Sequence, residues 1–163
     1  MRQKERFKHP TAVHFHCIRC GLCCGDTKER SRHVLLLLEE AEEIAAVTSK
    51  PVSMFASIIV GKEPYAYEMK KTKNGACVFL ADNLCTIYSS RPLICRFYPF
   101  ELGKGESKEP QFSFTRECPG IEKGRILGAK YFKKLFTLAQ TRLMQDWNAY
   151  AFFQESLKLL QML

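Results

Sequence analysis

Four cysteines within eight residues constrain this chain more than any other feature of its sequence. Residues 17–24 read Cys-Ile-Arg-Cys-Gly-Leu-Cys-Cys. A Cys-x-x-Cys turn lets two sulfur atoms converge on one ion, with metal–sulfur bonds of about 2.3 Å. Gly21 stands between the second and third thiols, where a tight turn needs a residue that tolerates positive φ. We therefore expect this segment to be a metal-ligand loop.

The cellular compartment decides how the eight cysteines are interpreted. The chain begins with charged residues, and no apolar run follows that would form a signal peptide. The aliphatic run at Leu35–Leu38 is far too short to span a bilayer. We predict a cytoplasmic protein without a membrane span, in which reduced thiols serve metal or redox chemistry rather than disulfides. The predicted metal ligands are Cys17, Cys20, Cys23, Cys24, Cys77, Cys85, Cys95 and Cys118.

The formal net charge of +8 would favour nucleic acid or another anionic surface as a partner. That charge counts every cysteine as neutral. Eight thiolates around two Zn²⁺ ions add eight negative and four positive charges, which leaves +4. The basic residues are also scattered along the chain, so a solvated surface explains them better than a nucleic-acid site.

Residue periodicity and turn signals predict a mixed order of short elements. A strand at 33–37 precedes a helix at 38–48, whose early glutamates complement the helix dipole. Asn74-Gly75 is a strong hairpin signal. The remaining expected elements are a short helix at 53–60 capped by Ser53, strands at 65–70, 77–80 and 84–88 joined by turns, a short helix after Ser90, a polar loop at 101–110, a strand at 111–116 and a helix from about 126 to 163.

These elements predict an α+β fold in which a small β meander is stapled by metal. We expect one domain over residues 1–163, with a core motif at about 14–125 and a helical segment at about 126–163. The last helix carries a 3.6-residue apolar stripe that includes Phe132, Phe136 and Ala139. The stripe predicts core packing, and its width leaves room for a protein partner on this helix.

The cysteine spacing allows two metal centres. The first three thiols match the opening of the bacterial ferredoxin run, in which a distant cysteine followed by proline completes a cluster, and Cys118-Pro119 fits that role. Cys-x-x-Cys occurs equally in zinc sites, so zinc, iron and an iron–sulfur cluster all stay open. Adjacent cysteines point in different directions, which assigns Cys23 and Cys24 to different centres. The predicted partition is Cys17, Cys20, Cys23 and Cys118 in one centre, and Cys24, Cys77, Cys85 and Cys95 in the other.

Three polar residues lie next to predicted ligands. Arg91 and Arg96 flank Cys95, where a guanidinium could offset thiolate charge or hold an anion. The alternative is that they pair with glutamate or cap carbonyls. His16 adjoins Cys17 and could serve as a ligand or donate to one, although an ordinary exposed or capping histidine is the preferred interpretation.

The whole pattern resembles the CxxCxxCC cysteine-cluster family, a zinc- or iron-chelating domain. The likeness covers roughly residues 14–125, with Glu122 at a position where the family often has glycine. It implies metal chelation, and similar motifs occur in flagellin lysine methylases and in proteins labelled iron–sulfur oxidoreductases. The matching residues are Cys17 through Cys24, Cys77, residues 85–99, Cys118, Pro119, Gly120, Ile121, Lys123 and Gly124.

Three functions stay open from the sequence. The first is a metal-binding module that holds zinc or iron, because all-cysteine zinc sites are usually closed and structural. The second is an iron–sulfur oxidoreductase or a methyl-transfer-related enzyme. The third is a basic RNA- or ribosome-associated zinc protein. No phosphate-binding loop, Ser-His-Asp order or carboxylate pair stands out in the sequence, so no catalytic residue is predicted.

Overall fold

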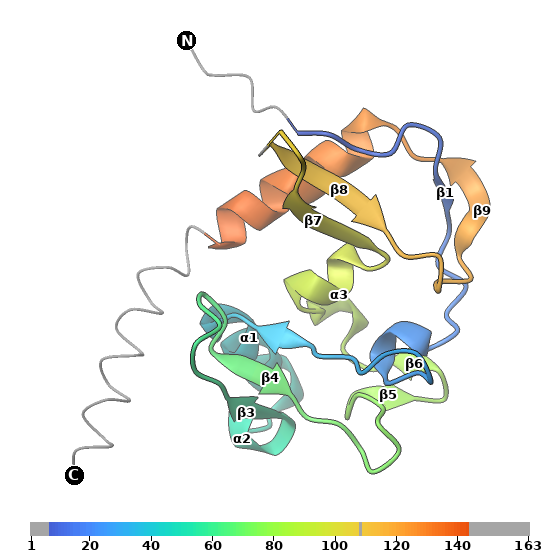
Figure 1. Cartoon of the computed structure of the whole chain (residues 1–163). Helices are drawn as coiled ribbons and strands as arrows, with labels where there is room; N and C mark the ends of the chain where they lie inside the picture. The colour runs from blue at the N-terminus through green and yellow to red at the C-terminus, as the bar shows by residue number, and fades with distance from the viewer. Residues whose placement is uncertain (1–6, 108, 144–163) are drawn as a thin grey trace.

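The fold is mixed α+β, with short helices and small antiparallel sheets around two hydrophobic clusters (Figure 1). The computed structural model describes residues 7–107 and 109–143. The expected α+β class is therefore confirmed. The β structure is divided among four separate small sheets within the described chain, rather than the single meander that the hairpin signals predicted.

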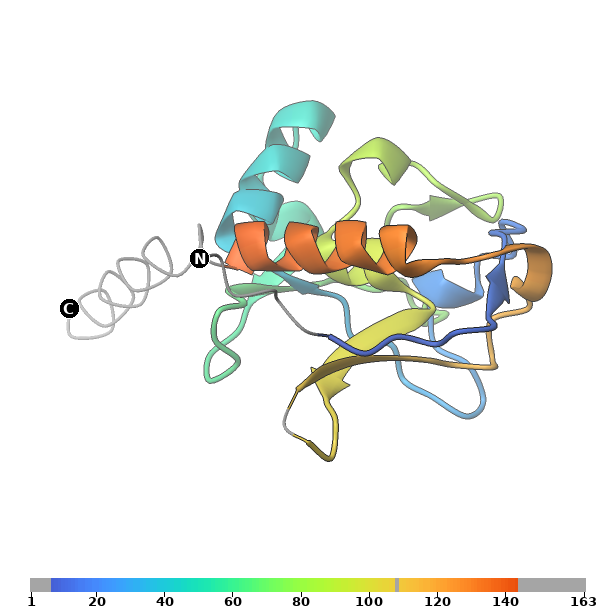
Figure 2. The same ribbon diagram turned by 90° about the horizontal axis from the view of Figure 1, so that it is seen from above.

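The molecule has two structural halves, which do not correspond to the two halves of the sequence. The first combines β1, from the start of the described chain, with β7, β8, β9 and a helix from its later part. β1 pairs antiparallel with β9, and β7 pairs antiparallel with β8. Residues 129–143 form a helix that crosses the molecule, with α1 on one side and the β7–β8 hairpin on the other (Figure 2). The strands are β1 (His14–Phe15), β7 (Phe100–Lys104), β8 (Pro110–Phe114) and β9 (Ile121–Ile126).

Aromatic rings fill the core of this half. The ring centroid of Phe132, on the helix, lies 5.2 Å from those of both Phe100 and Phe112. Phe136 and Ala139, one and two turns further along the helix, are also buried in the same cluster. The predicted core stripe of the last helix is thus confirmed over its described part, because all three residues are buried in the cluster that contains Phe100 of β7 and Phe112 of β8.

The second half contains a three-stranded sheet in the order β2-β4-β3 beside two helices. Leu36, Ala41 and Ile44 are fully buried there, together with Phe55 from α2. The elements are β2 (Leu35–Leu36), α1 (Leu38–Thr48), α2 (Val52–Phe55), β3 (Ala56–Ile58) and β4 (Tyr67–Met69).

Helix α3 (Leu93–Phe97) lies between the two halves (Figure 1). Its Leu93 and Phe97 belong to the first hydrophobic cluster, whereas Ile94 and Cys95 pack against the second. The remaining elements are the 3-10 helices η1 (Leu22–Cys24) and η2 (Tyr88–Ser90), and the paired strands β5 (Leu80–Ala81) and β6 (Leu84–Cys85). One five-residue helix therefore contributes to both cores.

Several expected elements are confirmed. The helix at 38–48 has the predicted bounds. A turn forms at Asn74-Gly75, where Gly75 has a φ of 76° and Lys71 bridges Cys77 across the hairpin. Asp82 and Asn83 both have positive φ and join β5 to β6 in a tight turn. These features depend on local residue preferences, which a sequence expresses directly.

Other expected elements are wrong. The helix at 53–60 ends at Phe55, because residues 56–58 add to β4 as an edge strand, and Pro51 rather than Ser53 precedes it. Residues 101–104 of the expected loop belong to β7, which pairs with β8. In both cases pairing with the next strand of the chain overrides a weak local signal.

Two expected helix starts are also wrong. No side chain caps α3 from Ser90; the Leu93 amide at its start instead donates to the carboxylate of Glu40, at 2.5 Å. The last helix does not begin at Ile126, which ends β9, but at residue 129. Residues 144–163, the second half of the predicted helix, lie outside the described residues.

Candidate metal centre

All eight cysteines line one cavity of about 400 Å³. None of them is in a disulfide. They come from five places in the fold: the 17–24 segment, the hairpin after β4, strand β6, helix α3 and the turn before β9. The walls also include Val34 and Met69 from the second core, and Phe15 and Tyr131 from the first. The cavity therefore lies where the two halves of the molecule meet.

The 17–24 segment folds as a tight turn followed by a single 3-10 turn. Gly21 has a φ of 77°, and its carbonyl accepts a hydrogen bond of 3.0 Å from the Cys24 amide. The predicted need for positive φ at this glycine is thus confirmed. The turn leaves the sulfur atoms of Cys23 and Cys24 3.8 Å apart.

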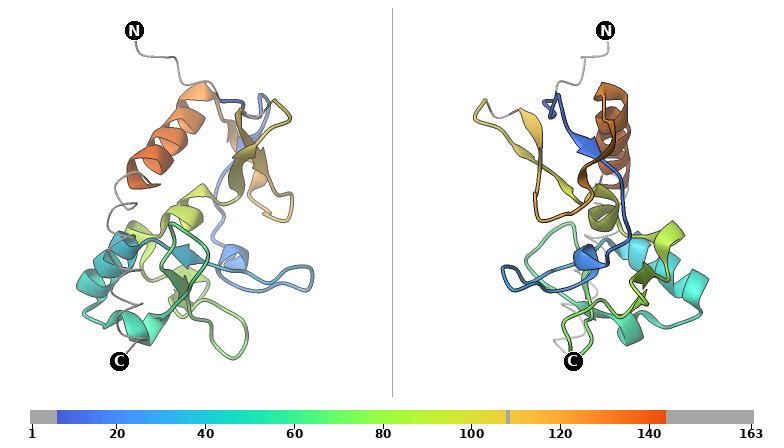
Figure 3. Two further views of the ribbon diagram at one scale, coloured as in Figure 1. Left: turned by 60° about the vertical axis from the view of Figure 1, so that its left-hand side comes forward. Right: turned by 90° about the vertical axis from the view of Figure 1, so that its right-hand side faces the viewer.

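Backbone pairing brings Cys77 beside Cys24. The Cys77 amide donates to the Cys24 carbonyl at 2.5 Å, and the Asp26 amide donates to the Gly75 carbonyl at 3.0 Å. Figure 3 shows the two loops extending side by side from the body of the molecule. The hairpin thus carries its cysteine back to the last thiol of the 17–24 segment.

A second pairing brings Cys118 towards the start of that segment. The His16 amide donates to the Gly120 carbonyl at 3.1 Å, and Phe15 lies opposite Ile121 in the β1–β9 pair. A Cβ atom at Gly120 would lie far inside contact distance of the His16 carbonyl oxygen. Only glycine therefore allows the approach that places the turn containing Cys118 beside the 17–24 segment.

The thiols differ strongly in how easily they lose a proton. A hydrogen bond from Cys24 lowers the pKa of Cys23 to about 6, with help from Arg32 and Arg91, and the same bond raises the pKa of Cys24 above its usual range. Burial raises the pKa of Cys95 to about 12. Burial also raises the pKa of three further thiols, those of Cys77, Cys85 and Cys118. A bound cation would offset this cost, because a thiolate that ligates a metal is deprotonated outright.

The structure gives Arg91 and Arg96 partly structural roles. Both line the cavity. Arg91 donates to the Tyr88 carbonyl at 3.0 Å and stacks its guanidinium 3.7 Å from the centre of the Tyr88 ring. Arg96 donates to the carbonyls of Arg91 and Ser89. Carbonyl capping is thus present for both, and Arg91 also lowers the pKa of the Cys23 and Cys85 thiols.

The third predicted neighbour, His16, is not among the residues that line the cavity. Its backbone pairs with Gly120, and Gly124 packs against its side chain. His16 therefore lies directly after β1, beside the turn that carries Cys118.

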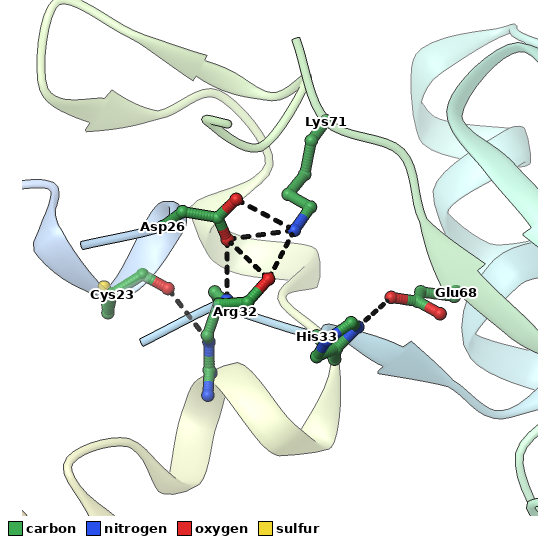
Figure 4. Close-up of polar contacts among 7 residues, drawn as sticks. Cys23, Asp26, Arg32, His33, Glu68 and Lys71 are labelled. Carbon is green, nitrogen blue, oxygen red and sulfur yellow. Dashed lines mark hydrogen bonds and ion pairs between the residues drawn. The ribbon is translucent and has the colours of Figure 1, made fainter. Parts of the chain in front are cut away.

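Sequence reasoning missed the basic residues that follow the 17–24 segment. Arg32 donates from Nε to the Cys23 carbonyl at 3.2 Å, and its side chain points away from the Asp26 carboxylate (Figure 4). Its positive charge lowers the pKa of Cys23, Cys77 and Cys95. Arg30 approaches the site from the same loop. The only available signal was two arginines soon after a cysteine cluster, and such a pair is common on ordinary surfaces.

Within residues 7–107 and 109–143, no three His, Cys, Asp or Glu side chains already form a set that could hold a metal ion. The thiols surround a shared space, but they are not gathered into a finished ligand set. Over the same residues, no helix is both long and apolar enough to cross a membrane.

Comparison with known proteins identifies one protein family. The family model CxxCxxCC, described as "Putative zinc- or iron-chelating domain", matches residues 16–119. Two uncharacterized proteins of Methanocaldococcus jannaschii are similar: one is 28% identical over 117 residues, or 69% of this chain and 60% of the relative, and the other is 27% identical over 119 residues, or 70% of this chain and 39% of the relative. The chain thus spans less than two thirds of the length of either relative. No solved structure matches significantly.

Proposed function

We propose that this chain, which belongs to the CxxCxxCC family of zinc- or iron-chelating domains, holds zinc or iron in its central cavity through the thiolates of eight cysteines. The observation that carries the proposal is that all eight thiols line one cavity although they come from five separate places in the fold. A fold without a use for these thiols would have no reason to bring them together.

The donor set suits these metals. Soft thiolate ligands select zinc, copper(I) and iron–sulfur clusters over hard cations. Eight thiolates complete two four-coordinate centres without help from histidine or carboxylate. Because metal–sulfur bonds are about 2.3 Å long, the proposal requires the thiols to move inward on binding.

We also propose the partition predicted from the cysteine spacing, with Cys17, Cys20, Cys23 and Cys118 in one centre and Cys24, Cys77, Cys85 and Cys95 in the other. Among the thiols, Cys20 affects the pKa of Cys118 most, whereas Cys77 and Cys85 affect the pKa values of Cys24 and Cys95. Cys23 adjoins both sets, because its sulfur lies 3.8 Å from that of Cys24, so its assignment rests on the sequence spacing.

Elemental analysis of protein isolated without oxygen tests the proposal. We expect two equivalents of zinc, or iron in cluster stoichiometry, and eight titratable thiols after unfolding in chelator. Cys77→Ser should lose one centre and keep the other. Met54→Ser, an exposed substitution away from the cavity, should lose neither. A folded, metal-free chain that takes up neither zinc nor iron would refute the proposal.

The volume of the cavity favours a second candidate, an iron–sulfur centre that performs redox or group-transfer chemistry. A cluster contains inorganic sulfide as well as iron, so it needs more room than a single ion, and a cavity of about 400 Å³ offers that room. Acid-labile sulfide and visible charge-transfer absorption in the isolated protein would establish it. Zinc without sulfide would leave chelation as the function. In either case the thiols must stay reduced, as in the cytosol.

A further inference from the structure

Five buried side-chain nitrogen or oxygen atoms lack a hydrogen-bond partner in the described part of the chain, and four of them lie in one place. These four are Nε and Nη2 of Arg30, Nη2 of Arg32 and the hydroxyl of Tyr98. Buried polar groups in native proteins are nearly always hydrogen-bonded, so such a concentration needs an explanation. We call these three residues the donor cluster.

The three residues contact one another around the Tyr98 ring. The guanidinium carbons of Arg32 and Arg30 lie 5.2 Å and 5.4 Å from the ring centre. Burial raises the pKa of the Tyr98 phenol, the close approach of the Arg30 guanidinium to the hydroxyl opposes that shift, and the Cys118 and Cys23 thiols add to it. The hydroxyl therefore stays protonated at neutral pH and keeps a proton to donate.

The positive charge of the donor cluster is poorly balanced by carboxylates. No carboxylate within the described ranges pairs with the Arg32 side chain, because the Asp26 carboxylate accepts from the Arg32 backbone amide instead (Figure 4). Arg30 lies 3.6 Å from a Glu117 carboxylate oxygen, beyond ordinary hydrogen-bond range. A partly buried guanidinium whose charge is poorly balanced is costly, so negative charge placed beside these arginines would stabilise the fold.

Arg32 and Tyr98 both lie beside the cysteines. Arg32 donates from Nε to the Cys23 carbonyl at 3.2 Å and lines a small space together with Cys24 and Cys77, and Tyr98 lines the cavity that contains all eight thiols. Arg32 and Tyr98 also line a neighbouring cavity of about 350 Å³, so an external anion bound there is the competing explanation that the experiment has to distinguish. A centre with four thiolates around one divalent ion has a net charge of −2, which two guanidinium groups would balance.

We propose that Arg32 and Tyr98 donate hydrogen bonds to the thiolates of the metal-loaded centres, and that Arg30, which lies over the Tyr98 ring, helps to balance their negative charge. This inference rests on the proposed function, and it assigns positioning residues rather than ligands. Hydrogen bonds to ligand sulfur atoms stabilise metal–thiolate centres and tune their electronic properties. The donor cluster would thus make the site selective for an all-thiolate, negatively charged centre.

Arg32→Met tests the inference, because methionine keeps much of the side-chain length and removes the charge. Competition with a chelator should show zinc affinity lowered about ten- to hundredfold, and the melting temperature of the metal-free protein should be unchanged or higher. Arg32→Lys should recover part of the affinity. Arg116→Met removes an exposed arginine whose ion pair is with Glu122, and it should change neither quantity.

Substitution with Co²⁺ adds a readout that a purely structural role would not move. Loss of an N–H donor leaves a thiolate richer in electrons, so the sulfur-to-cobalt charge-transfer band of Arg32→Met should shift to longer wavelength. Tyr98→Phe, which removes only the hydroxyl, should shift the band in the same direction and serves if Arg32→Met does not fold.

The outcomes separate this inference from the proposed function. If the unaltered chain binds no metal, the proposed function fails. If it binds metal and both variants match it in affinity and in spectrum, only the inference fails. Inorganic phosphate that stabilises the metal-free chain in an Arg32-dependent way, with metal affinity unchanged, would also overturn the inference in favour of an external anion.

Discussion

Glu40 is the buried acidic residue of the second half, and it links two helices through its carboxylate. One oxygen accepts from the Leu37 amide at 3.0 Å at the start of α1, and the other accepts from the Leu93 amide at 2.5 Å at the start of α3. A carboxylate near two helix N-termini is favoured by both helix dipoles. Because α3 contains Cys95, this one side chain connects helix stability to the metal cavity.

Glu40→Gln tests that role. The amide keeps the size of the side chain but loses the charge, and one of its two positions becomes a donor that faces a backbone N–H. We expect the free energy of unfolding to fall by about 2 kcal/mol, in line with hydrogen bonds to a charged group. Chemical denaturation of the metal-loaded protein measures the change.

Glu42→Gln is the matched control, since Glu42 is exposed on the same helix. It should change the free energy of unfolding by no more than about 0.5 kcal/mol. Equal effects of the two substitutions would show that the Glu40 carboxylate has no special role.

At the scale of elements, short backbone pairings rather than long helices set the positions of the thiols. Residues 24–26 pair with 75–77, and β1 pairs with β9. Each pairing contains a glycine that the other strand approaches closely. At Gly75 a Cβ atom would lie 2.8 Å from the Asp26 carboxylate, which the Lys71 ammonium and the Arg32 amide hold in place.

Gly75→Ala should therefore separate the hairpin from the 17–24 segment. We expect weaker retention of the centre that contains Cys24 and Cys77, measured as faster zinc release to a chelator. Gly61→Ala is a close control, because Gly61 has a similar φ of 80° but nothing within 4 Å of the added carbon. Both substitutions incur the left-handed backbone penalty of about 1–2 kcal/mol, so a difference in zinc release isolates the steric contact. Equal zinc-release rates for the two variants would show that the close approach at Gly75 does not help to retain the metal.

The elements that the sequence predicted correctly have local causes. The helix of α1 follows from its apolar period, and the turn at Asn74-Gly75 follows from glycine chemistry. The elements that it missed depend on pairing with another strand: β1 exists only because β9 returns beside it, and β3 only because β4 lies next to it. The β1 and β9 segments are too far apart in sequence for a local pattern to relate them, and the short β3 segment has no strong strand pattern of its own.

The residues of the candidate site likewise divide into those that the sequence could predict and those that it could not. Cysteine spacing was enough to nominate the eight thiols that line the cavity, because few other residue patterns have that chemistry. Arg30, Arg32 and Tyr98 could not be nominated, since their importance comes from burial and missing partners. Arg91 and Arg96 were nominated by position alone, and the structure adds the carbonyl contacts that sequence could not supply.

At the scale of the whole molecule, the cavity lies between two hydrophobic cores that are each substantial. The first contains Phe100, Phe112 and Phe132, and the second contains Leu36 and Phe55, all fully buried. Metal would then join two halves that already have their own apolar packing, with α3 between them.

Hydrogen exchange with and without chelator tests this arrangement. After metal removal, amides at 17–26, 75–85 and 117–120 should exchange faster, because metal–thiolate bonds no longer hold those segments. Amides of α1 and of the helix at 129–143 should keep most of their protection, since Tyr131 alone among the residues of these two helices lines the cavity. Uniform loss of protection across both cores would show that metal is needed for the entire fold.

The central claim is that zinc or iron is bound in this cavity by cysteine sulfur alone. X-ray absorption at the metal edge of protein isolated without oxygen tests it most directly. The account predicts a first shell of sulfur atoms at about 2.3 Å, with four sulfurs per metal. A first shell dominated by nitrogen or oxygen at about 2.0–2.2 Å would contradict the account.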